Sequence, residues 1–84
     1  MLFVTLLNII PGKFQEAIRL IKNPPKTQNI QIKSRVGIFG KPDAIMIFEA
    51  KDEQSAVDFV LQFADVASTN TCVAFPADAF KWTQ

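Results

Sequence analysis

The sequence predicts an α+β fold whose elements follow the order strand, helix, strand, strand, helix, strand. Its 84 residues are enough for one domain with one core. Apolar residues switch between a period of two and a period near 3.6, and clusters of Pro and Gly separate several of these segments. This order is that of the ferredoxin-like fold, an antiparallel sheet with both helices on one face. We therefore expect a single ferredoxin-like domain over residues 1–84, with residues 76–84 as a C-terminal tail.

The first half of the chain predicts a strand, a helix and a second strand. Residues 2–10 form an apolar run rich in strand-forming residues, which Pro and Gly then end. Residues 13–22 carry one helical stripe, and the prolines at 24–25 end that helix. Residues 30–39 alternate with a period of two, as a strand does. The helical stripe consists of Phe14, Ala17, Ile18 and Ile21.

The second half predicts a strand, a helix and a final strand. Residues 43–50 form an apolar strand that pairs with residues 30–39 as a hairpin. Asp52 is a favourable N-cap for a helix that runs to residue 64. Residues 69–75 follow as the last strand, which Pro76 ends.

The hairpin register follows if Phe39 lies opposite Asp43. Arg35 then lies opposite Ile47, and Lys33 lies opposite Glu49. One common face of the hairpin would hold Ile30, Ile32, Val36, Ile38, Ala44, Met46 and Phe48.

The strands predict self-association, because they are apolar on both faces while the helices cover only one. We expect the second face to pair with another copy, in a homodimer or larger homo-oligomer of the dimeric α/β barrel type. The predicted interface residues are Phe3, Leu7, Ile45 and Ile47. The alternative is that the chain's own tail, with Phe80 and Trp82, folds over this face.

Composition limits the chemistry. The chain has no histidine and one cysteine, so an internal disulfide cannot form, and a zinc site or a histidine-ligated haem is not expected. We expect no metal and no cofactor, and we interpret the single cysteine, Cys72, as a small buried residue. A net charge of +1 without a basic stripe argues against nucleic acid, and the apolar N-terminus is too short to span a membrane. These features are typical of a cytoplasmic protein.

Several short motifs from Gly40 onward resemble the GYD-domain family of small uncharacterised proteins. The matching residues are Gly40, Asp43, residues 45–50, Asp52, Glu53, Ala56, Phe59, residues 68–71, Ala74, Phe75 and Phe80. The resemblance implies a dimeric α/β barrel related to the ligand-binding domain of Lrp/AsnC regulators. The tyrosine that gives the family its name is missing, and Pro42 lies near its place.

Six residues are candidates for binding a ligand. On the predicted register Lys33, Arg35 and Glu49 lie on the uncovered face, where they could hold a small acidic ligand. The resemblance adds Gly40 and Asp43 as a turn that contacts an effector, and Asn8 lies at a strand end. Each also has a structural interpretation: a solvated edge, turn chemistry, or bonding to local backbone.

Three functional hypotheses follow. The first is a small-molecule-sensing or oligomerisation module without a DNA-binding part. The second is a small cofactor-free enzyme, an oxygenase or isomerase of the dimeric barrel type, for which the lack of histidine and tyrosine leaves few catalytic groups. The third is a purely structural assembly domain.

Overall fold

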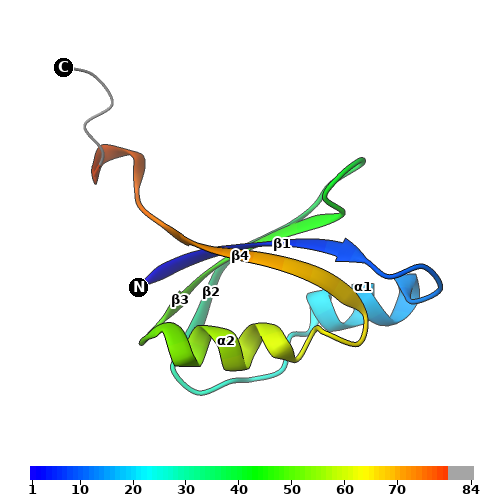
Figure 1. Ribbon diagram of the computed structural model, residues 1–84, viewed down its shortest axis with the longest axis horizontal. Coiled ribbons are helices and arrows are strands. Elements are labelled where there is room, and N and C mark those ends of the chain that lie inside the picture. The colour runs from blue at the N-terminus through cyan, green and yellow to red at the C-terminus, as the bar shows by residue number, and fades with distance from the viewer. Residues whose placement is uncertain (80–84) are drawn as a thin grey trace.

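The computed structural model describes residues 1–79 and confirms the βαββαβ order (Figure 1). Phe80 and Trp82, the tail residues named above, lie outside the described residues. The elements are β1 (Leu2–Ile9), α1 (Phe14–Lys22), β2 (Ile30–Gly37), β3 (Ala44–Ala50), α2 (Glu53–Leu61), β4 (Ala67–Ala74) and a short 3-10 helix, η1 (Ala77–Ala79).

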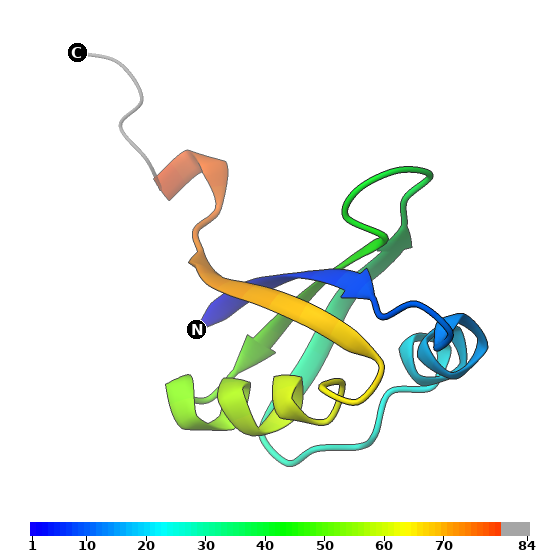
Figure 2. The ribbon, with the colours of Figure 1, turned by 45° about the vertical axis from the view of Figure 1, so that its right-hand side comes forward.

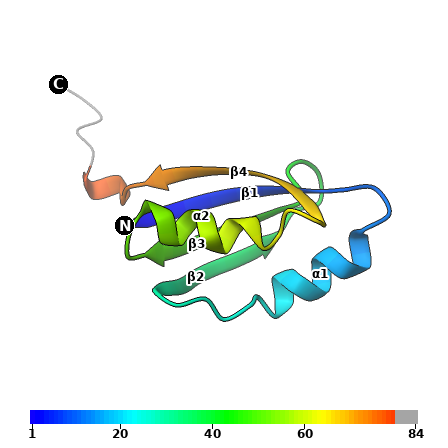
Figure 3. The ribbon, with the colours of Figure 1, turned by 60° about the horizontal axis from the view of Figure 1, so that its bottom comes forward.

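The four strands form one antiparallel sheet in the order β2-β3-β1-β4. Both helices lie on the same face of this sheet (Figure 3). This arrangement is compatible with the predicted ferredoxin-like fold. We call the helix side the covered face and the other side the open face. Strands β2 and β4 are the two edges.

The core lies between the covered face and the helices. Four aromatic rings run through it in series: Phe3 stacks on Phe48 at 5.6 Å, Phe48 lies 4.9 Å from Phe59, and Phe59 lies 5.5 Å from Phe63 between ring centroids. Thr5 is also buried on the covered face, and its hydroxyl oxygen accepts a hydrogen bond of 2.7 Å from the Thr71 hydroxyl. This bond explains how a polar residue occupies a core position.

The start of α2 is capped as the sequence predicts. Asp52 has an extended backbone, and its carboxylate accepts a 2.8 Å hydrogen bond from the Ser55 backbone N–H. This bond lowers the pKa of Asp52, because it favours the charged form. The helix ends at Leu61 rather than at residue 64, since residues 62–66 form turns that lead into β4.

The prediction that Phe3 and Leu7 lie at the interface is wrong, because both residues lie on the covered face. They are 4% and 0% exposed and belong to the core. The register of β1 against β3 decides this, because Phe3 lies opposite Phe48 and Leu7 opposite Ala44. Residues directly opposite each other in antiparallel strands point to the same face, so Leu2, Val4 and Leu6 are the β1 residues of the open face.

The predicted hairpin register is also wrong. Val36 lies opposite Ile45, and Ile32 lies opposite Phe48, with a register shift between Ile32 and Ser34. The irregularity changes which side chains share a face. Arg35 therefore lies opposite Met46 on the covered face, and Val36 moves to the open face.

Two smaller expectations fail as well. Phe14 is 63% exposed rather than part of a buried stripe, because the buried residues of α1 are Ala17 and Ile21 further along the helix. Cys72, which we interpret from sequence as a small buried residue, is exposed. It lies opposite Val4, so it belongs to the open face of edge strand β4.

Candidate functional site

The first functional candidate is an apolar patch on the open face. The patch extends across β2, β3 and β1, because its residues lie opposite one another on neighbouring strands: Val36 opposite Ile45, Ile45 opposite Leu6, and Ile47 opposite Val4. We call this set the open apolar patch; its members are Leu2, Val4, Leu6, Val36, Ile45 and Ile47. They are partly buried by one another and by neighbouring strands, apart from Val36, which is 48% exposed.

The described part of the C-terminal segment does not cover this patch. Figures 1 and 2 show residues 75–79 leading away from the sheet beyond the end of β4. The helices lie on the covered face, so the open apolar patch has no cover from residues 1–79 (Figure 3). A contiguous apolar patch rimmed by polar residues is typical of an interaction surface.

Beside the patch, β4 supplies a more polar margin. Asn70 lies opposite Leu6, Cys72 opposite Val4, and Ser68 opposite Asn8. Asn8, one of the predicted ligand residues, therefore lies at the end of β1 on this margin, away from Glu49 at the far end of β3.

Two predicted ligand residues, Arg35 and Asp43, line one groove of about 330 Å³ between α1 and the β2–β3 hairpin. Both already bind within the chain. Arg35 Nη1 donates to the carbonyls of Ile21 at 3.1 Å and Lys22 at 2.6 Å, at the end of α1. This contact satisfies carbonyls that a helix end leaves without partners.

The Asp43 carboxylate holds the hairpin to the end of β1. Its Oδ2 accepts a 2.7 Å hydrogen bond from the Ile9 backbone N–H and lies 3.5 Å from Lys41 Nζ. Gly40, in the same turn, has a φ of +150°, which favours glycine. These contacts and the Gly40 backbone therefore support the structural interpretation of this turn.

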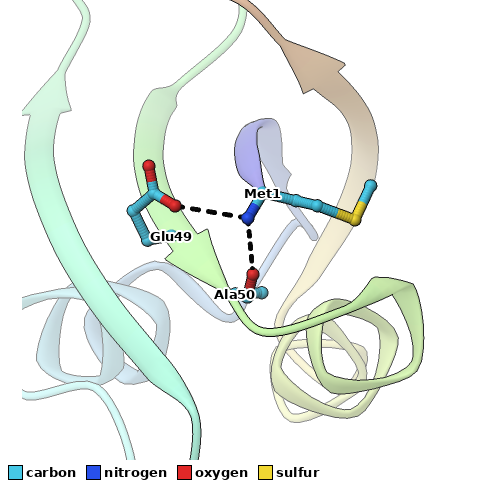
Figure 4. A network of polar contacts seen from close by, with 3 residues as sticks. All are labelled: Met1, Glu49 and Ala50. Carbon is cyan, nitrogen blue, oxygen red and sulfur yellow. Dashed lines mark hydrogen bonds and ion pairs between the residues drawn. The ribbon is translucent and has the colours of Figure 1, made fainter.

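Lys33 and Glu49 are not brought together. The neighbour of Glu49 on β2 is Gln31, and Lys33 lies at the register shift. Glu49 instead forms an ion pair of 3.3 Å with the N-terminal ammonium group of Met1, which also donates to the Ala50 carbonyl at 2.8 Å (Figure 4). The predicted pocket of Lys33, Arg35 and Glu49 is therefore wrong as a cluster.

Sequence reasoning misses a second groove, between α2 and β4. It has a volume of about 290 Å³, and its exposed apolar lining consists of Val57, Leu61 and Val73. The available signal is the spacing of Val57 and Leu61, two apolar residues four positions apart that share one side of a helix.

Comparison with family models, with curated proteins and with solved structures finds no match. The resemblance to the GYD-domain family gains no support there and stays a prediction. Within residues 1–79, no helix is long and apolar enough to cross a bilayer. The same residues contain no group of three or more His, Cys, Asp or Glu side chains that could hold a metal ion.

Proposed function

We propose that this protein is a homo-oligomerisation module in which a second copy covers the open apolar patch. The observation that carries this proposal is that the central strands β1 and β3 are apolar on both faces, while α1 and α2 cover only one. A second copy offers an identical apolar patch, and two such patches form a self-complementary interface around a twofold axis.

The energy available fits reversible association. Full burial of a Val, Leu or Ile side chain gains about 1.5–3 kcal/mol. The patch residues are already partly buried, so on the order of 1 kcal/mol each remains to be gained. Six such residues from each copy give a gross gain comparable to the cost of bringing two molecules together, roughly 4–15 kcal/mol.

Assembly has more support than small-molecule sensing. The groove that holds Arg35 and Asp43 could admit a small acidic ligand, but the contacts of both side chains are structural. An acidic ligand would have to displace the α1 carbonyls from Arg35 Nη1, and the negative charge of Asp43 in the same groove would repel it. No contact among residues 1–79 favours the enzyme hypothesis, which stays a prediction of the resemblance.

Sedimentation equilibrium of the wild type and of Ile47→Lys tests the proposal. Lysine at this position would place an unpaired charge inside the interface and weaken association roughly tenfold or more. Val36→Lys is a second variant at the exposed rim of the patch. Gln15→Lys, which adds the same charge on exposed α1, should leave the mass unchanged. A monomeric wild type, or an Ile47→Lys variant that associates like the wild type, would contradict the proposal.

A further inference from the structure

The two edges of the sheet differ in how they are protected. Strand β2 has a register shift between Ile32 and Ser34, and it carries Lys33 and Arg35. Irregular pairing and charge are devices that discourage an edge from pairing with another chain. Strand β4 has neither: its eight residues, Ala67–Ala74, contain no charge and no proline and pair regularly with β1. Among residues 1–79 nothing pairs with its outer side, which is therefore an unprotected edge in the described part of the chain.

The hydrogen-bonding capacity of this edge is that of a substantial interface. In an antiparallel strand, alternate residues direct both their N–H and C=O groups to the same side. Eight residues therefore leave about four that face outward, and two such edges could form about eight main-chain hydrogen bonds. Stable protein interfaces typically contain roughly ten.

A mostly apolar groove, whose lining also includes Glu53 and Thr71, lies on the helix side of this edge. Val57 and Leu61 from α2 and Val73 from β4 line it and are 49%, 62% and 40% exposed. A strand added beside β4 would direct alternate side chains toward this groove. Edge hydrogen bonds combined with alternate side-chain contacts are how proteins bind an extra strand.

We infer that β4 pairs with β4 of a second copy, antiparallel about a twofold axis perpendicular to the sheet. Because the strand is uncharged, a copy of it brings no like charges into opposition. The symmetry places the two α2 helices on the same side, so each copy covers the other's groove. The product is a continuous eight-stranded sheet, and this interface is separate from the open apolar patch.

The two interfaces together predict a closed assembly. Two eight-stranded sheets stacked through their open apolar patches would form a tetramer with three perpendicular twofold axes. We expect the wild type to sediment at four times the chain mass of 9.4 kDa. Breaking either interface alone should leave dimers.

Single and double variants separate the two interfaces. Val73→Lys adds a charge to the edge and its groove without touching the open face, and Ile47→Lys does the reverse. We expect dimers from each single variant and monomers from the double variant, with Gln15→Lys as the tetrameric control. Circular dichroism establishes that each variant is folded. If Val73→Lys does not fold, Val57→Lys tests the same groove from α2.

The outcomes distinguish this inference from the proposed function. If Val73→Lys and Val57→Lys both keep the wild-type mass while Ile47→Lys lowers it, edge pairing is overturned and face pairing stands. If only the edge variants lower the mass, edge pairing stands and the proposed function fails. A monomeric wild type overturns both edge pairing and face pairing. In that case β4 does not pair with β4 of a second copy.

Discussion

In the central strands β1 and β3, both faces of the sheet are largely apolar, but aromatic residues occur on only one of them. The covered face holds the large residues Phe3, Met46 and Phe48, and it tolerates buried Thr5 through a hydrogen bond. The open face holds the aliphatic residues Val4, Ile45 and Ile47 in the same two strands. Hydrophobicity along a strand therefore does not say which face the helices cover. In β1 and β3 the aromatic residues lie only on the covered face, whereas aliphatic residues such as Leu7 and Ile47 occur on both, so only the aromatic ones mark the core.

The largest expected effect comes from removing an aromatic side chain of the covered face. Phe48→Ala should cost about 3–5 kcal/mol of unfolding free energy, because Phe48 is fully buried and contacts both Phe3 and Phe59. Its neighbour variant Ile47→Ala should cost only about 1–2 kcal/mol in dilute solution, since Ile47 is partly exposed there. Urea unfolding measures both.

Equal costs for these neighbours would break the distinction between the faces. If Phe48→Ala does not fold, Phe48→Leu provides a milder comparison, because a smaller volume change is better tolerated. Phe48→Leu should then cost more than Ile47→Val, the matched milder change at the partly exposed neighbour.

A second variant tests what holds α1 over the covered face. Arg35→Ala removes both hydrogen bonds to the carbonyls of Ile21 and Lys22 and should cost about 1 kcal/mol. Arg35→Lys keeps the charge near the helix end and should recover part of this loss. Thermal unfolding measures the difference; an unchanged Tm for Arg35→Ala would show that these bonds contribute nothing to docking α1.

The smallest effect concerns the cap of α2 and depends on pH. The Ser55 N–H holds the pKa of Asp52 below its ordinary value of 3.8. A carboxylate with a lowered folded-state pKa stabilises the protein above the unfolded pKa, and this contribution is lost as pH falls through the folded pKa. Asp52→Asn keeps a capping oxygen without the charge. The Tm advantage of the wild type over Asp52→Asn should therefore shrink at acidic pH, whereas a constant difference would contradict this assignment.

Local signals in the sequence predict the elements well. The changes of period, Asp52 as a cap, and the alternation of Ala44, Met46 and Phe48 are all local, and the structure confirms them. Which side chains of β1 face the helices is not decided by local sequence. Thr5 interrupts the apolar parity of Phe3 and Leu7, and its partner Thr71 lies 66 residues away.

The candidate site is harder to predict for the same reason. Ile45 and Ile47 are correctly placed on the open face, but Val36 and Arg35 exchange faces because of the register shift near Lys33. Nothing in residues 30–37 taken alone fixes where that shift falls. The groove beside β4 also depends on bringing Val57 and Leu61 next to Val73, which only the complete sheet order does.

The single thiol of Cys72 offers the most direct test of whether a second copy covers the open face. Cys72 is exposed in the lone chain and lies opposite Val4 of the open apolar patch. In a Val73→Lys background, chosen to remove the inferred edge pairing, we expect thiol labelling to slow as protein concentration rises. Adding Ile47→Lys should restore fast labelling at every concentration. A labelling rate that is independent of concentration and unaffected by Ile47→Lys would contradict the account.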